Sequence, residues 1–103
     1  MAKIPCEYDD LQGITTRVYD VPSFNITAGT IGTWVGQALI DIGLTGYTPI
    51  GCYLSSFSHP ASYNITFFMA SNKIRVHFFR TNTSAYTVPE GDAKITVLYK
   101  KND

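Results

Sequence analysis

Apolar and polar side chains alternate along most of this chain. Between Tyr63 and Met69, the residues Tyr, Ile, Phe and Met occupy every second position, with Asn and Thr among the residues between them. Successive side chains of a β-strand point to opposite faces of a sheet, so a period of two predicts strands rather than helices. The same pattern predicts strands over residues 22–27, 31–38, 50–57, 63–69, 73–81 and 93–99.

Turn-forming residues separate these strands. Ala28-Gly29-Thr30 predicts a turn, Ala70-Ser71-Asn72 predicts a tight hairpin, and Pro89-Glu90-Gly91-Asp92 is a strong turn signal within a loop over 82–92. Short strands that follow one another at intervals of about ten residues are typical of sandwiches and barrels. The sequence therefore predicts an all-β fold, an antiparallel, jelly-roll-like β-sandwich of about six to seven strands.

Helical periodicity is almost absent. The best helical candidate covers residues 33–44, but it contains Gly36 and Gly43 and lacks a capping box. Its first half is therefore interpreted as a strand. Within that strand, the glycines beside Trp34 indicate a place where a neighbouring ring lies over the backbone.

The first twenty residues differ from the rest. Cys6 to Gly13 is acidic and irregular, whereas Ile14 to Val21 has the pattern of an edge strand. We interpret residues 1–20 as an N-terminal arm or edge segment and residues 21–103 as the β-sandwich domain. An arm of this kind would pair with an exposed strand of a neighbouring subunit. A frayed terminus is the alternative.

Charge and composition limit the classes of partner. Eight basic and eight acidic residues give a formal net charge of zero, and charged residues make up 16% of the chain. Nucleic-acid binding depends on basic patches, and anionic membranes attract basic segments, so neither partner is expected. Low charge with 14% aromatic residues fits a domain whose surface is partly covered by neighbouring subunits.

Several apolar residues fall on faces that the alternation predicts to be polar. They are Leu54, Phe68, Phe79 and Leu98. One face of a sheet is therefore expected to contact something other than water. The N-terminus has no apolar segment of a secretory signal, and no apolar run reaches the ~18 residues of a membrane helix. We expect a soluble protein that is synthesised in the cytoplasm.

The residues with reactive side chains do not form a catalytic or metal-binding pattern. Cys6 and Cys52 lack the spacing of a zinc site, and both free thiols and a disulfide fit the sequence. Neither His59 nor His77 has a carboxylate or nucleophile at a suggestive spacing. There is no glycine-rich phosphate loop and no nucleophile elbow. We expect no enzymatic activity, no metal and no cofactor.

The aromatic residues are the main candidates for binding. Tyr and Trp rings stack against the apolar faces of sugars, anchor protein interfaces, or pack in the core, and these three roles stay open here. The loops over 58–62 and 82–92 are expected to present polar and aromatic groups outward. The candidate binding residues are Trp34, Tyr53, His59, Tyr63, Arg75, His77, Arg80 and Tyr86.

Two segments of the chain carry a resemblance to a known group of proteins. Leu44-Thr45-Gly46-Tyr47-Thr48-Pro49-Ile50-Gly51 opens one predicted strand, and Ala93-Lys94-Ile95-Thr96-Val97-Leu98-Tyr99-Lys100 closes the chain's last one. With the segments between them, residues 22–100 resemble small tail-associated and fibre-tip domains of tailed bacteriophages and prophages of gut bacteria. The resemblance implies a β-sandwich virion protein, often trimeric, of a kind that commonly recognises cell-surface saccharides.

Three hypotheses follow. The first is a virion protein that acts as a receptor-binding or fibre-tip module, recognises a host surface saccharide or packs into a tail or baseplate appendage, and forms a homo-oligomer, expected to be a trimer. The second is a capsid decoration or head-fibre protein that binds other virion proteins and no host ligand. The third is a stand-alone carbohydrate-binding module. The first two place the protein in the virion.

Overall fold

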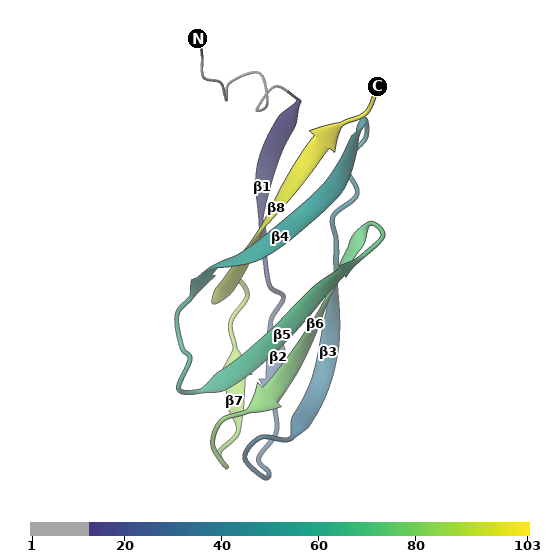
Figure 1. The fold of residues 1–103 in the computed structure, drawn as a ribbon. Helices are drawn as coiled ribbons and strands as arrows, with labels where there is room; N and C mark the ends of the chain where they lie inside the picture. The colour runs from purple at the N-terminus through teal and green to yellow at the C-terminus, as the bar shows by residue number, and fades with distance from the viewer. Residues whose placement is uncertain (1–12) are drawn as a thin grey trace.

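The alternating segments of the sequence become the strands of two facing antiparallel sheets. The computed structural model describes residues 13–103, and within this range the fold is an all-β sandwich of eight strands without helices (Figure 1). The strands are β1 (Ile14–Asp20), β2 (Phe24–Ile26), β3 (Trp34–Asp41), β4 (Tyr47–Phe57), β5 (Tyr63–Ala70), β6 (Lys73–Arg80), β7 (Tyr86–Val88) and β8 (Ala93–Lys101).

Strand pairing is nested along the chain. β1 pairs with β8, β2 with β7, and β3 with β6, all antiparallel. β4 adds to the free side of β8 and β5 to the free side of β6, which gives the sheets β1-β8-β4 and β3-β6-β5 and a short β2-β7 ribbon. The ribbon continues the β1-β8 pair past Pro22 and Pro89. This order, in which the ends of the chain pair and the pairing then proceeds inward, agrees with the jelly-roll-like sandwich predicted from sequence.

The predicted strands are confirmed, with shifts at their ends and one addition. β7 lies within the predicted loop over 82–92, because three residues are too few for alternation to be recognised. β3 begins at Trp34 rather than Ile31, since Gly32 adopts a positive φ of 84° in the preceding turn. The segment over 14–21 predicted as an edge strand is β1, which pairs with β8 over its whole length. Residues 1–12, including most of the predicted arm, lie outside the described residues.

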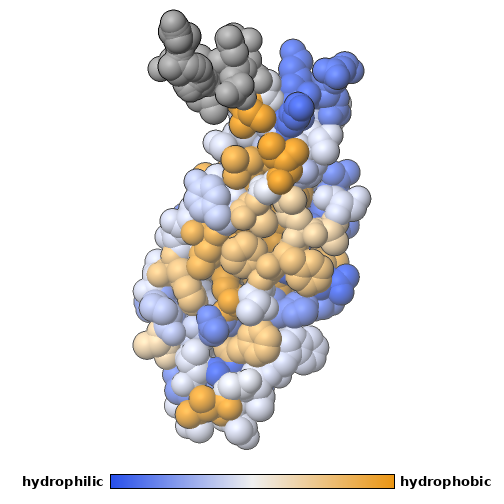
Figure 2. Space-filling view, viewed as in Figure 1, coloured by the Kyte–Doolittle hydropathy of each residue, from blue (hydrophilic) through white to orange (hydrophobic). Residues whose placement is uncertain are grey.

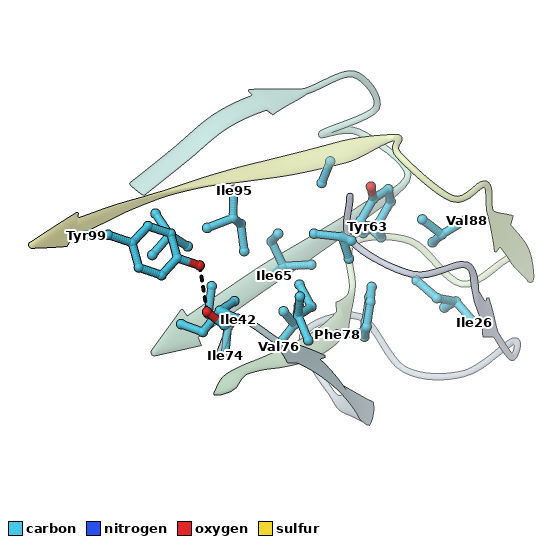
Figure 3. Packing of buried hydrophobic residues seen from close by; sticks show 14 residues of the cluster. Ile26, Ile42, Tyr63, Ile65, Ile74, Val76, Phe78, Val88, Ile95 and Tyr99 are labelled. Carbon is cyan, nitrogen blue, oxygen red and sulfur yellow. Dashed lines mark hydrogen bonds between the residues drawn. The ribbon is translucent and has the colours of Figure 1, made fainter. Parts of the chain in front are cut away.

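The core lies between the inner faces of the two central strands. Ile95 and Tyr99 of β8 lie on the side of the strand that faces β6 residues such as Ile74 (Figure 3). These side chains and that of Val97 are fully buried. Tyr99 donates a hydrogen bond from its hydroxyl to the carbonyl oxygen of Ile42 at 2.6 Å. Its hydroxyl also pairs with that of Tyr19. Burial raises the pKa of Tyr99, so the hydroxyl keeps its proton and satisfies a carbonyl that the core would otherwise leave without a partner.

The prediction that Leu54 lies on a polar face is wrong. Leu54 lies opposite Ile95 and packs against the core. β4 shifts register between Pro49 and Gly51 and again between Leu54 and Ser56. A bulge adds a residue to one strand and so reverses the faces that follow it, which simple alternation does not anticipate.

Each sheet has two edge strands, β1 and β4 in one sheet and β3 and β5 in the other. Of these, β4 and β5 lie next to each other without pairing (Figure 1). Figure 2 shows hydrophobic side chains gathered on this side of the molecule. The half-buried apolar residues on the inner faces of these two strands are Cys52, Leu54, Phe57, Phe67 and Met69.

Gly36 allows an aromatic ring to lie against β3. A Cβ atom added at Gly36 would lie 2.6 Å from Cζ of Phe24. The Phe24 ring cannot retreat, because it stacks on the buried Phe78 ring with centroids 4.2 Å apart. This contact joins the β2-β7 ribbon to the β3-β6-β5 sheet, and it confirms the predicted ring at Gly36. The prediction fails at Gly32, where a Cβ atom would meet nothing within 4 Å.

We expect Gly36→Ala to lower the free energy of unfolding by about 1–3 kcal/mol, the usual cost of forcing atoms into a packed core. Gly51→Ala is the matched control, because a Cβ atom there would meet nothing within 4 Å. Urea unfolding of both variants checks this expectation. Equal stability of the two variants would contradict it.

Candidate functional site

The outer face of the β3-β6-β5 sheet forms a regular array of side chains in three rows. Cross-strand partners share a face, so the register places Trp34, Phe79 and Asn64 in the first row. Gln37, His77 and Thr66 form the second row, and Leu39, Arg75 and Phe68 form the third. Rows on one face of a sheet are about 7 Å apart. We call these nine residues the aromatic face.

Large apolar side chains on this face are open to solvent. Trp34 is 55% exposed, Leu39 is 50% exposed and Phe68 is 49% exposed. Phe68 therefore lies on an outer face as the alternation indicated, and Phe79 does so too, half-buried beside Trp34. Single exposed apolar residues are ordinary, but a group of them on one flat face is typical of a binding surface.

His77 lies between the two exposed rings. The Trp34 ring stands at 82° to the imidazole with centroids 6.4 Å apart, and the Phe68 ring stands at 86° to it at 6.0 Å. Edge-to-face contacts of this kind fix the relative orientation of rings. Nε2 of His77 is buried and has no hydrogen-bond partner among the described residues.

Arg75 supplies the positive charge of the aromatic face. Its guanidinium carbon lies 5.9 Å from the centroid of the Phe68 ring, which is a cation–π contact. Lys73, the next outward residue of β6, lies 3.8 Å from a carboxylate oxygen of Asp41. Within residues 13–103, Arg75 has no such acidic partner. Trp34, Arg75 and His77 are thus the predicted binding residues that share the aromatic face.

A second group of candidates surrounds a buried carboxylate. One oxygen of Asp92 lies 2.6 Å from Nδ1 of His59, and the other accepts a hydrogen bond from the Tyr63 hydroxyl at 2.7 Å. The Tyr86 ring stacks on Tyr63 with centroids 5.9 Å apart. Tyr63 is fully buried, and burial with the Asp92 contact raises its pKa above the ordinary value. These contacts join the 58–62 loop to the turn before β8.

Tyr63 is therefore a core residue and not a surface for a ligand, since the alternation places it on the inner face of β5. His59 is half exposed at the rim of the cluster, and Tyr86 is half-buried in β7. The sequence predicts only a turn at Asp92. Its turn is present, closed by a hydrogen bond from its amide to the carbonyl of Pro89. No sequence signal connects it to His59, because the two are brought together only by the fold.

Arg80 is occupied by the loop between β2 and β3. Its Nε donates to the carbonyl of Thr27 at 2.7 Å, and its terminal nitrogens donate to the hydroxyls of Thr27 and Thr33. A Cβ atom at Gly29 would lie 2.6 Å from Nε, so glycine lets the loop approach the guanidinium. Arg80 therefore holds this loop through its guanidinium.

Tyr53 belongs to the other sheet. Its cross-strand neighbours in the outer row of β1-β8-β4 are Thr96 and Val18, and Leu98 lies on the same face one row away. Tyr53 is 52% exposed and Val18 is 60% exposed, and Ile50 is exposed at the bulge in β4. We call Val18, Ile50, Tyr53, Thr96 and Leu98 the second face. Thr96 is buried between its neighbours, so the exposed part of this face is formed mainly by Val18, Ile50 and Tyr53. The second face points away from the aromatic face.

The described residues bring together no three potential metal ligands from His, Cys, Asp and Glu side chains. Burial raises the pKa of the half-buried Cys52 thiol. Its predicted alternatives, a free thiol and a disulfide with Cys6, stay predictions because Cys6 lies outside the described range. Residues 13–103 contain no helix of the length and apolar character needed to cross a membrane.

Comparisons with protein-family models, with curated proteins and with solved structures found no match to this chain.

We expect Tyr63→Phe to lower the free energy of unfolding by about 1–3 kcal/mol, because the buried Asp92 carboxylate would lose a donor without access to water. Tyr53→Phe, which removes a hydroxyl from a half-exposed ring, is the control and should be neutral. Thermal and urea unfolding measure both variants. An unchanged Tyr63→Phe variant would show that Asp92 finds another partner.

Proposed function

We propose that this chain is a receptor-binding or fibre-tip domain of a bacteriophage virion, and that it recognises a host surface saccharide through the aromatic face. The observation that carries the proposal is the open array around His77, where exposed Trp34 and Phe68 rings stand among side chains that form hydrogen bonds. This array supports the proposed binding role, and the sequence resemblance supports the proposed virion context.

The chemistry of the aromatic face suits a sugar. Pyranose rings offer apolar C–H faces that pack on aromatic rings, while their hydroxyls exchange hydrogen bonds with polar side chains. Gln37, Asn64 and Thr66 are all exposed on this face and supply both donors and acceptors. A flat sheet also holds such groups on rigid backbone, which limits the entropy lost when a ligand binds.

The two segments that carry the phage resemblance are neighbours in the fold. Thr48-Pro49-Ile50-Gly51 lies in β4 and Thr96-Val97-Leu98-Tyr99 lies in β8, and the two strands pair, with Pro49 opposite Tyr99. Together they form much of the second face and of the core beneath it. This arrangement supports a role for these segments in the frame of the domain rather than in ligand contact.

The second face supports assembly with further copies of the chain. Val18, Tyr53 and Ile50 are all more than half exposed there, on the sheet that points away from the proposed saccharide surface. Self-association through it, in the trimer expected from the resemblance, would bury these side chains and leave the aromatic face free. A capsid decoration protein without a host ligand would use the same second face, so saccharide binding distinguishes the two hypotheses.

We expect the purified chain to bind at least one class of bacterial surface saccharide on a glycan array, and Trp34→Ala to weaken that binding by about tenfold or more. Truncation of an anchoring tryptophan commonly costs roughly 2 kcal/mol or more. Ile31→Ala truncates a similarly exposed apolar side chain that belongs to neither the aromatic face nor the second face, and it is the control. Absence of saccharide binding by the unmodified chain would overturn the proposed function.

We expect the chain to form a homo-oligomer in solution and Tyr53→Lys to shift it towards the monomer, because burying the new charge in an apolar contact is costly. Leu39→Lys places the same charge on the aromatic face and should leave the oligomer intact. Light scattering during size-exclusion chromatography gives the masses. A monomeric unmodified chain at high concentration would contradict this assembly.

A further inference from the structure

We infer that the aromatic face selects acidic saccharides, with Arg75 pairing with the carboxylate of a sugar acid that lies across Phe68 and Trp34. The inference rests on the proposed function and narrows its ligand class. Arg75 has no acidic partner among the described residues, and its charge favours a ligand that carries an anionic group.

The position of Arg75 suits the binding of an anion. It occupies the middle of the third row, between Leu39 and Phe68, and its guanidinium lies over the Phe68 ring. A cation–π contact of this kind favours side-chain conformations near the ring and leaves the N–H groups free to donate. A carboxylate matches the guanidinium in charge and in its two-pronged geometry.

The neighbouring charges leave Arg75 as the site of attraction. The next outward residue of β6 is Lys73, and Asp41 lies opposite it on β3. The Lys73 amino group and the Asp41 carboxylate are 3.8 Å apart, so these two charges pair with each other. The other ion pairs of the described residues involve Asp20 and Asp92, which belong to β1 and to the turn before β8. The aromatic face therefore carries a positive charge that its own pairs do not neutralise.

A single unpaired cation favours a sugar acid over a nucleic acid. Strands of DNA or RNA carry one phosphate per nucleotide, and proteins that bind them neutralise several phosphates at once. A sugar acid needs only one positive group beside an aromatic platform. The rows that carry Trp34 and Arg75 are about 14 Å apart along the strands, which gives an oligosaccharide room to contact both.

His77 gives the face a second polar group beneath its rings. Its buried Nε2 has no partner among the described residues, and the rings of Trp34 and Phe68 stand beside it. Burying a polar atom without a hydrogen-bond partner is costly. If the Trp34 or Phe68 ring rotated aside, a ligand hydroxyl could reach Nε2 and form the missing hydrogen bond. Selectivity for acids does not depend on this step, because Arg75 is exposed without any movement.

The test compares matched acidic and neutral sugars. Oligogalacturonates and sialylated glycans, each with its methyl ester as the neutral counterpart, are titrated calorimetrically into the unmodified chain and into Arg75→Gln and Arg75→Lys. Lys73→Gln is the matched control, since it removes a charge from the same strand and face that is already paired with Asp41. Circular dichroism confirms that each variant is folded. An unstructured thymidine oligonucleotide serves as the competing polyanion.

We expect at least one acid to bind about tenfold or more tightly than its methyl ester. Arg75→Gln should remove this preference, Arg75→Lys should restore part of it, and Lys73→Gln should preserve it. Equal binding of acids and esters, or an acid preference that survives Arg75→Gln, would overturn the inference while leaving saccharide binding intact. Binding of no sugar would overturn the proposed function as well. Tighter binding of the oligonucleotide than of any sugar would assign the face to nucleic acid instead.

Discussion

The two-residue period of the central strands β6 and β8 is the constraint on which the rest of the structure depends. Each lies between two other strands, so its backbone groups are paired on both sides and its side chains must divide between the core and the outside. Ile74, Val76 and Phe78 face inward from β6, and the residues between them face outward. Packing of the core therefore fixes which side chains the outer faces display, and in what order.

This coupling explains why residues of the core and of the candidate site alternate along one strand. Arg75 and His77 are held at fixed spacing on the aromatic face because the buried Val76 between them cannot move without opening the core. The contact between Gly36 and Phe24 acts in the same way at the edge, since it fixes β3 next to the ribbon. The aromatic face thus gains its rigidity from contacts on the opposite side of the sheet.

The sequence predicts the strands well because their alternation is strong, and it predicts the faces well wherever the register is regular. Phe68, Phe79 and Leu98 lie outward as expected, whereas Leu54 does not, because bulges in β4 depend on pairing with β8 that a single strand does not reveal. The same limit applies to the site. Trp34, Arg75 and His77 were recognised as residue types, but their common face follows from the register between β3 and β6. Asp92, Gln37 and Leu39 were missed because their partners lie far away in the chain.

The two outer faces differ in a way that favours separate roles. The second face is apolar with few charged groups, and the Lys94–Asp20 pair closes one end of it at 2.6 Å. The aromatic face mixes rings, amides and an unpaired guanidinium, a composition that would be costly to bury against a copy of itself because two Arg75 charges could be brought together. Burying this face in a permanent contact would cost free energy because its charged and polar groups would lose water. A ligand with polar groups of its own can replace that water. Assembly through the second face leaves that surface outward, so the alternation that builds the core also separates the proposed contact with other copies from the proposed contact with the host.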